Sequence, residues 1–330
     1  MDSQEIKIAA LYQFFRVTDP AALQQSLLAD ALELGIKGTL LVAEEGINGT
    51  IAAKSDQLDA FLGRLKRRPG LESLDVKISY ANIVPFYRLK VKLKKEIVTL
   101  GQPDIDPLVC VGEYVEPRDW NALISDPEVL LVDTRNDYEV AIGRFKGAIN
   151  PDTESFRELP DYIQQHIDTN NIEKVAMYCT GGIRCEKSTA YLKQYGVKHV
   201  YHLKGGILAY LEQVAEDDSL WEGECFVFDN RVTVNHQLQP GVYDLCHACR
   251  FPIDEADKQS EYYEPGVSCP RCYQKKSAED KTRFAERQKQ IQLARSRGYE
   301  HLGQDQRLGQ DQRPGQDQRL GQDQKQVAKG

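Results

Sequence analysis

The chain has 330 residues, of which 41% are hydrophobic and 28% charged, a composition typical of two or three globular domains. No segment approaches the ~18 consecutive apolar residues of a membrane span, and the N-terminal residues lack the basic flank and apolar core of a secretion signal. We therefore predict a cytoplasmic protein with no membrane partner, whose eight cysteines are metal ligands or reactive thiols rather than disulfides.

The formal net charge of −8 conceals an uneven distribution. Residues 64–95 carry ten lysines and arginines against two carboxylates, whereas residues 101–274 carry 15 basic and 30 acidic residues. An acidic average argues against a nucleic-acid partner only where the charge is evenly spread. A polyanion can therefore still bind to the basic segment.

Hydrophobic patterns in residues 1–95 predict a ferredoxin-like α+β domain. The expected elements are a strand at 6–15, a helix at 20–34, strands at 39–43 and 50–53, a helix at 57–68 and a strand at 74–80. Gly46 and the pair Asn48-Gly49 supply the turn chemistry of a hairpin between the two middle strands. The resulting β-α-β-β-α-β order is the split β-α-β pattern, which fixes no chemistry by itself.

Basic side chains gather in the second predicted helix of this domain and in a strand that follows it. They are Arg64, Lys66, Arg67, Arg68, Arg88, Lys90, Lys92 and Lys94. One interpretation is a solvated helix end beside a lysine-rich edge strand. The other is a tRNA-binding surface that contacts phosphates, because no aromatic RNA-recognition motif accompanies the charges. No feature of the chain indicates DNA as a partner.

The rest of the chain divides into four further predicted parts after a linker at 96–117, where prolines are frequent. Residues 118–220 alternate short apolar strands with helices, which predicts a doubly wound parallel sheet covered on both faces. Residues 221–276 form a cysteine-rich module of short strands and turns. Residues 277–298 form a helix, for which Ser277 and Asp280 have the spacing of a capping box. Residues 299–330 repeat the unit GQDQ and are expected to be disordered.

The segment MYCTGGIRCEKS, at 177–188, places a cysteine between a buried strand and a helix. The glycines allow the loop Thr180, Gly181, Gly182 and Ile183 to turn its N–H groups inward, which makes an anion-binding nest at a helix N-terminus. The same field favours the thiolate of Cys179, and Arg184 adds a positive charge. We predict Cys179 as an activated, exposed nucleophile, with Arg184 and Cys185 as further catalytic residues.

This loop resembles the active-site loop of the rhodanese family. VDTRNDYEVAIGRFKGAINP at 132–151 and LKGGI at 203–207 resemble the segments that precede and follow it. Cysteine-dependent phosphatases also use a Cys–Arg loop, but they place five residues between the two side chains, and here there are four. The shorter loop suits a sulfur atom better than a phosphoryl group.

Cys185 permits two interpretations. It lies in the first turn of the helix, where it can act as a resolving thiol toward an oxidised or persulfide form of Cys179. Alternatively, it is a small residue packed under the loop, because cysteine is commonly buried.

Two further cysteine pairs lie near the C-terminus. Cys246 and Cys249 form one C-x-x-C pair, and Cys269 and Cys272 form another after a gap of 19 residues. This spacing predicts a tetrahedral structural zinc site without catalysis. An unmetallated redox pair and an iron–sulfur centre are the alternatives.

The chain contains no G-x-G-x-x-G, Walker loop or H-E-x-x-H motif, so no nucleotide cofactor and no zinc-peptidase chemistry are predicted. Taken together, AEEGINGTI at 43–51, the loop segments above, CHACR and VSCPRC resemble the rhodanese-domain tRNA uridine hydroxylase family. The resemblance runs from near the N-terminus to about Gly298 and excludes the repeat tail.

The resemblance implies oxygen-dependent 5-hydroxylation of the wobble uridine, position 34, of tRNA, with Cys179 as the active-site cysteine and molecular oxygen as co-substrate. Composition and spacing alone indicate only an activated thiol, a zinc module and a basic surface. A persulfide-carrying sulfurtransferase and a non-enzymatic RNA-binding scaffold therefore stay open as alternatives. The electron or sulfur donor is not indicated by the sequence.

Overall fold

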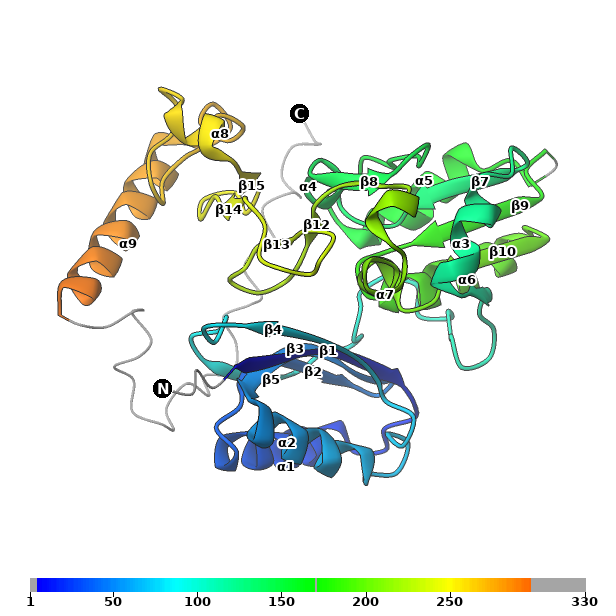
Figure 1. Cartoon of the computed structure of the whole chain (residues 1–330), viewed down its shortest axis with the longest axis horizontal. Coiled ribbons are helices and arrows are strands. Elements are labelled where there is room, and N and C mark those ends of the chain that lie inside the picture. Colours follow the sequence, from blue (N-terminus) through cyan, green and yellow to red (C-terminus); the bar gives the residue numbers. More distant parts are fainter. Residues whose placement is uncertain (1–4, 170, 298–330) are drawn as a thin grey trace, which may run out of the picture.

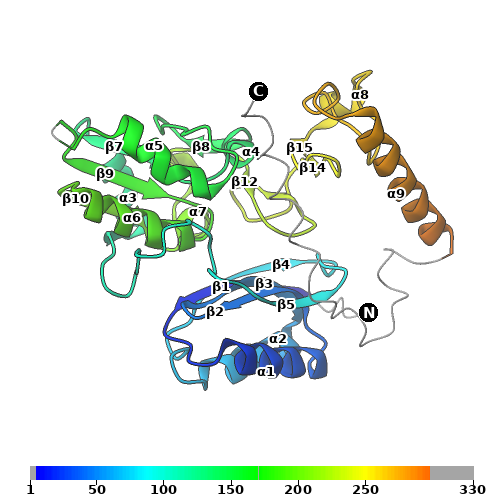
Figure 2. The same ribbon diagram turned by 180° about the vertical axis from the view of Figure 1, so that it is seen from behind.

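The computed structural model describes residues 5–169 and 171–297, so the predicted GQDQ tail lies outside the described residues. The chain folds into an N-terminal domain, a central domain and a C-terminal module, which meet around a short hairpin in the middle of the molecule (Figures 1 and 2). No helix in the described ranges has the length and apolar character needed to cross a membrane.

The N-terminal domain is a five-stranded sheet with two helices on one face (Figure 1). Its elements are β1 (Ile6–Phe14), α1 (Pro20–Glu33), β2 (Lys37–Ala43), β3 (Gly46–Lys54), α2 (Ser55–Lys66), β4 (Asp75–Ala81) and β5 (Leu89–Leu93). The strand order is β4-β1-β3-β2-β5, in which β5 alone pairs in parallel, with β2. The ferredoxin-like prediction is confirmed, with β5 as an added edge strand.

The hairpin between β2 and β3 turns earlier than predicted. Ala43 pairs with Gly46, so the loop is Glu44-Glu45, and Asn48-Gly49 lies inside β3 opposite Leu41 and Leu40. Gly49 has a different role there, because a β-carbon at this position would lie 2.1 Å from the carbonyl oxygen of Thr39. The glycine therefore permits close strand approach and not a turn.

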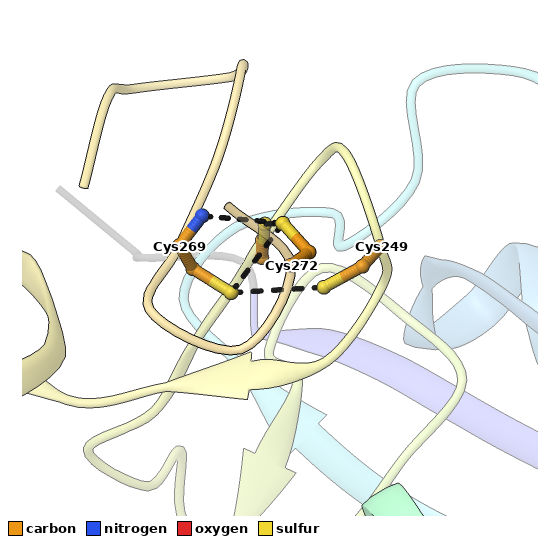
Figure 3. Close-up of side chains that lie close together, drawn as sticks. Cys249, Cys269 and Cys272 are labelled. Atoms are coloured by element: carbon orange, nitrogen blue, oxygen red, sulfur yellow. Dashed lines mark hydrogen bonds between the residues drawn. The ribbon is translucent and has the colours of Figure 1, made fainter. Parts of the chain in front are cut away.

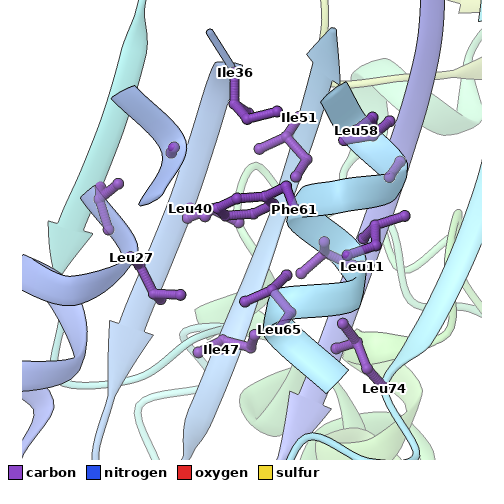
Figure 4. Packing of buried hydrophobic residues seen from close by; sticks show 14 of the residues in the cluster. Leu11, Leu27, Ile36, Leu40, Ile47, Ile51, Leu58, Phe61, Leu65 and Leu74 are labelled. Carbon is purple, nitrogen blue, oxygen red and sulfur yellow. The ribbon is translucent and has the colours of Figure 1, made fainter. Parts of the chain in front are cut away.

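The two faces of this sheet have different environments. Figure 4 shows the helix-covered face, where Phe61 and Leu65 of α2 pack against Leu40, Ile47 and Ile51 of the sheet. The alternate residues of the strands point to the opposite face, which lies toward the central domain and the C-terminal module (Figure 1). Helices therefore cover one face only, and the second face is available for a site.

The central domain is a parallel sheet with helices on both faces, as predicted. Its strands run in the order β6 (Glu113–Val115), β10 (His199–Leu203), β9 (Lys174–Tyr178) and β7 (Val129–Asp133). Alternate residues of β9 pack on opposite sides: Val175 and Met177 face α5 (Leu159–His166) and α6 (Ile183–Tyr195), and Ala176 and Tyr178 face α3 (Pro117–Ile124) and α7 (Gly206–Gln213). Such two-sided burial explains the continuous apolar strands.

Residues 96–117 are more ordered than the predicted linker. β6 (Glu113–Val115) belongs to the central sheet, and Leu100 and Ile105 are buried against the core that includes Leu159 and Ile163. The prolines of this segment therefore mark an irregular path over the domain surface rather than a free connection.

The C-terminal module begins by packing on the central domain. β11 (Trp221–Gly223) pairs with β8 (Gly143–Phe145), and the hairpin of β12 (Cys225–Phe226) and β13 (Thr233–Val234) continues the same core. The cysteine-rich part follows with β14 (Asp244–Leu245), β15 (Pro252–Ile253) and α8 (Glu255–Gln259). The last described element is α9 (Ala278–Ser296), whose first turn is capped by Ser277 accepting from the Asp280 N–H, as predicted.

Candidate active site

Cys179 directly follows β9 and begins a tight loop into α6. The Gly182 N–H donates to the Cys179 sulfur over 3.1 Å, and the N–H groups of Arg184 and Cys185 also point at it. Gly182 has a φ of 100°, a left-handed conformation that a side chain would strain. The predicted nest of inward N–H groups is therefore formed at the N-terminus of α6.

The surroundings of Cys179 favour its thiolate. Burial alone raises the pKa of this thiol, but a hydrogen bond from Cys185, the charge of Arg184 and the backbone N–H groups outweigh burial, so the pKa is lowered. Burial and the hydrogen bond to Cys179 raise the pKa of Cys185 well above its ordinary value. The pair is thus a thiolate and a thiol donor, with the negative charge on Cys179.

The expectation that Cys179 is exposed is wrong, because the residue has 0% solvent exposure. It instead lines a cavity of about 400 Å³ between all three parts of the molecule. The walls include Ile8 and Tyr12 of the open sheet face, Gly181 of the loop, and Phe228 beyond β12. This volume lies within the range of small-ligand sites, so a ligand bound in the cavity would lie next to the loop that carries the sulfur.

Arg184 does not offer its guanidinium to an anion in the loop. Its two terminal nitrogens donate to both carboxylate oxygens of Glu139 over 2.6 and 2.7 Å, and both side chains are almost fully buried. Thr180 donates to the same carboxylate over 3.2 Å. No local pattern pointed to Glu139 beyond its place in the 132–151 segment. Arg184 therefore fixes the loop against the neighbouring segment, while its charge and the backbone N–H groups both lower the pKa of Cys179.

The segment before the loop is organised by a second buried ion pair. Arg135 binds Asp133 through two nitrogens, and it also donates to the carbonyl oxygens of Glu139 and Gly143. Both charged side chains have 0% exposure. This pair holds the backbone around Glu139 in place, which in turn orients Arg184.

The LKGGI segment supports the loop from the other side. The N–H groups of Ile207 and Leu208, in the first turn of α7, donate to the carbonyl oxygens of Cys179 and Thr180 over 2.9 and 3.1 Å. A β-carbon at Gly206 would lie 2.5 Å from the Cys179 oxygen and 2.7 Å from the Gly182 nitrogen. Only glycine permits this contact between the two segments.

A hydrogen-bonded cluster missed by sequence reasoning reaches the cavity next to Cys179 through Tyr12, while Tyr114 and Glu186 line a separate hollow behind it. Tyr12 and Tyr114 donate to the two carboxylate oxygens of Glu186 over 2.9 and 2.7 Å. Burial raises the pKa of Glu186, although these hydrogen bonds act in the opposite direction. Tyr12 comes from β1 and is far from Glu186 in sequence. The alternation of side chains along β1 is the only sequence signal that puts Tyr12 on the face of the sheet opposite the helices. The cluster can hold or pass a proton at the cavity wall.

The eight basic residues predicted to bind tRNA do not form one surface. Lys90 and Lys92 lie on the face of β5 opposite its core residues Leu89 and Val91, on the cavity side of the sheet. The residues of α2 and its C-terminal end lie on the helix-covered side. Two of these, Arg64 and Arg68, pair with Asp30 of α1, and Arg64 also pairs with Glu33. The prediction of a single basic face is therefore wrong.

The four C-terminal cysteines converge, with all sulfur atoms within 4.8 Å of one another. Figure 3 shows Cys249, Cys269 and Cys272, with sulfur separations of 3.7 Å from Cys249 to Cys269 and from Cys269 to Cys272. Cys246 lies 4.0 Å from Cys272. Zinc–thiolate bonds of about 2.3 Å in a tetrahedron put sulfur atoms about 3.8 Å apart, so these residues fit a four-cysteine metal site.

Comparison with known proteins assigns the N-terminal domain and the central domain to described domain families. Residues 6–97 match the UPF0176 acylphosphatase like domain, and residues 116–213 match the rhodanese-like domain. The chain is therefore a rhodanese-like protein with an acylphosphatase-like N-terminal domain. It is also 58% identical over 296 residues to the "tRNA uridine(34) hydroxylase" of Teredinibacter turnerae, which covers 90% of this chain and 92% of that protein. The chain belongs to the tRNA uridine(34) hydroxylase family.

Solved structures of rhodanese-like proteins match about a third of the chain. A rhodanese-like domain from Anabaena sp. is 18% identical, with a TM-score of 0.29, and covers 34% of this chain and 80% of that one. A rhodanese-related protein from Thermoplasma volcanium is 19% identical, with a TM-score of 0.25, and covers 31% and 92% of the two chains.

Proposed function

We propose that this protein hydroxylates the wobble uridine, position 34, of tRNA at C5, and that it does so in the cytoplasm. Membership of the tRNA uridine(34) hydroxylase family supports the reaction. The observation that carries the assignment of the site is a thiolate-favouring Cys179 in the wall of a cavity of about 400 Å³. A flipped base is the part of a tRNA that a cavity of this size can accept.

Molecular oxygen is the proposed co-substrate. One oxygen atom enters the C5–H bond of uracil, and the other leaves as water with two protons and two electrons from an external reductant. The Cys179 thiolate adds to C6, which leaves C5 as a nucleophilic enolate that takes the oxygen atom. Loss of the C5 proton and expulsion of the Cys179 thiolate then restore the ring.

Protons for these steps come from groups at the cavity wall. Tyr12 lines the cavity and donates to Glu186, whose pKa is raised by burial. A carboxyl group with a raised pKa holds a proton more readily than an ordinary one, which suits general acid–base work through the Tyr12 hydroxyl. Arg184 acts as a positioning residue, because Glu139 occupies its donors.

The test is mass spectrometry of tRNA nucleosides from a deletion strain complemented with the wild-type or the Cys179→Ser protein. We expect the deletion to lose a uridine one oxygen atom heavier than uridine, wild type to restore it, and the serine variant to fail while still binding tRNA. Labelled oxygen gas should transfer its label to the nucleoside. A serine variant that still modifies tRNA would exclude the thiol mechanism.

A sulfurtransferase is the second candidate, because the Gly182 N–H donates directly to the Cys179 sulfur, as a persulfide carrier requires. Turnover of thiosulfate and cyanide to thiocyanate, or loss of a thiolated nucleoside in the deletion strain, would support it. Neither result is expected from a hydroxylase.

We further propose that Cys246, Cys249, Cys269 and Cys272 hold a structural zinc ion. The ion would close the coordination shell and connect the two turns that carry the cysteines, without a role in the reaction. Metal analysis of the purified protein should find one zinc per chain, and Cys269→Ser should lower both the zinc content and the thermal stability of the module. A full complement of iron with visible absorption would contradict zinc.

A further inference from the structure

A second hollow, of about 760 Å³, lies between the N-terminal sheet, the central domain and the cysteine-rich module. Its basic residues come from two parts of the chain that are far apart in sequence. They are Lys90 of β5 and four residues of the cysteine-rich module, Arg250, Arg271, Lys275 and Lys276. We call this the basic hollow.

The basic charges of this hollow exceed the acidic ones. The carboxylates in its lining are Asp137, Glu154 and Asp229, of which Asp229 is already bound by Arg231 through two nitrogens. Within the part of the chain that the structure describes, Arg250, Lys275 and Lys276 form no salt bridge with a carboxylate. Arg250 and Lys275 are also exposed. These side chains are available to an anionic ligand.

Arg250 has a backbone conformation that favours glycine. Its φ is 68°, and its N–H donates to the Cys246 carbonyl oxygen over 2.7 Å in the turn that carries the first cysteine pair. Glycine at this position would relieve the strain and lose nothing in the packing of an exposed side chain. An arginine held here against that preference points to a use for its guanidinium.

Aromatic rings accompany the charges. Phe86, Phe226, Phe228 and Phe251 line the basic hollow, and the Phe251 ring lies 3.6 Å below the Arg271 guanidinium. Phe228 is 56% exposed, which is unusual for a phenylalanine. Basic groups interleaved with exposed aromatic rings are the pattern by which proteins bind single-stranded RNA, through phosphates and stacked bases.

The basic hollow adjoins the Cys179 cavity. Thr39, Val227, Phe228 and Asp229 line both. A nucleotide strand that places one base next to Cys179 therefore has its neighbouring phosphates at the basic hollow. We propose that the basic hollow binds the single-stranded anticodon-loop nucleotides adjacent to the modified uridine, so that the cysteine-rich module contacts RNA directly. This proposal rests on the proposed function.

The test measures binding of an unmodified tRNA to the full-length protein by fluorescence anisotropy over a range of salt concentrations. The variants are Lys275→Ala/Lys276→Ala in the hollow and a control, Arg144→Ala/Lys146→Ala in the central domain, which removes the same charge from two exposed side chains that line neither the Cys179 cavity nor the basic hollow. We expect the hollow variant to raise Kd about tenfold and to reduce the slope of log K against log salt by about 0.7 per lost contact. The control variant should bind as wild type.

Arg250→Gly separates binding from folding. We expect it to leave the zinc content unchanged, to keep or raise the thermal midpoint, and to weaken tRNA binding severalfold. Equal losses from the hollow variant and the control variant would show binding by overall charge and overturn the proposal, as would a hollow variant that binds like wild type.

Binding is measured without chemistry, so the outcome does not depend on hydroxylation. A protein that binds tRNA through the hollow and modifies no uridine contradicts the proposed function alone.

Discussion

The thiolate of Cys179 is stabilised by direct hydrogen bonds from its neighbours and, without direct contact, by the charge of the arginine that follows it in the loop. The Gly182 N–H and the Cys185 thiol contact it, whereas Arg184 is bound to Glu139 and acts on it only through space. Two roles for Cys185 are compatible with this geometry: a hydrogen-bond donor that keeps Cys179 ionised, and a resolving thiol that attacks an oxidised sulfur. They predict different effects of substitution.

Cys185→Ala and Cys185→Ser distinguish these roles. If Cys185 donates a hydrogen bond, alanine removes the donor and raises the pKa of Cys179, since the hydrogen bond to Cys185 lowers it. The thiolate then forms only at higher pH, so kcat/KM should fall most on the acid side of the profile, while serine keeps most of the activity.

Equal loss in both variants at every pH would instead indicate a resolving thiol. Cys225→Ala is the control, because Cys225 is equally buried and its thiol donates to the Phe226 carbonyl oxygen outside the loop. It should leave the pH profile unchanged. The measurement is the rate of tRNA modification over a pH series with each variant.

At the scale of elements, the loop depends on the close approach of two turns, one after β9 and one after β10. Gly206→Ala places a β-carbon 2.5 Å from the Cys179 carbonyl oxygen, in addition to the strain of a φ of 67°. Gly147→Ala imposes the same kind of strain at a φ of 79°, but no atom lies within 4 Å of the new carbon. Both variants carry the strain of a positive φ, and only Gly206→Ala, at a buried position, adds a clash.

We expect Gly147→Ala to cost about 1–2 kcal/mol of unfolding free energy and no activity. Gly206→Ala should cost more, and it should lower kcat by displacing the loop. Denaturant unfolding and single-turnover rates of the two variants test this expectation. Equal activity in the two would mean that the loop does not require the contact with Gly206.

The same elements show what could be predicted from the sequence. The helices and long strands of the N-terminal domain follow from periodicity, because each has a helix-covered face that must be apolar. The Asn48-Gly49 pair misled the turn assignment, since glycine also serves close strand contacts, and those contacts are made by residues distant in sequence. β6 was missed because three extended residues have no periodicity.

For the site, local sequence predicted Cys179, its nest and the convergence of four cysteines, because these depend on residues close together in the chain. Glu139 and Tyr12 could not be found in this way, since they reach the loop only through the tertiary fold. The exposure of Cys179 was mispredicted for the same reason: the N-terminal domain covers the loop.

At the scale of the whole molecule, the cavity exists only because the N-terminal sheet is held over the central domain. Lys187 of α6, 1% exposed, connects the two, because its ammonium lies 2.7 Å from a carboxylate oxygen of Glu45 in the β2–β3 turn and 2.7 Å from one of Glu96. Glu45 also accepts from the Ile97 N–H, and Glu96 from the Leu100 N–H. One buried charge thus joins α6, the β2–β3 turn and the connecting segment.

Lys187→Met keeps the length and apolar stem of the side chain but leaves two carboxylates facing each other without a cation. Breaking a buried pair in this way costs about 3–5 kcal/mol, because the remaining charges stay desolvated. Since the pair joins two domains, we expect that cost to appear as separation of the domains. The connecting segment 96–112 should become cleavable by protease, and the cavity should lose its N-terminal wall.

KM for tRNA modification should then rise. The thiolate of Cys179 should still be alkylated at low pH, because the groups that stabilise it lie within the central domain. Lys174→Met is the control, because Lys174 pairs with Asp126 and Glu128 at the exposed end of the central sheet, where such a pair contributes about 0–1 kcal/mol. Lys187→Met with a protected segment 96–112 and an unchanged KM would show that apolar contacts alone hold the N-terminal sheet over the thiol loop. Cleavage with a raised KM would show that the active cavity is a product of domain assembly.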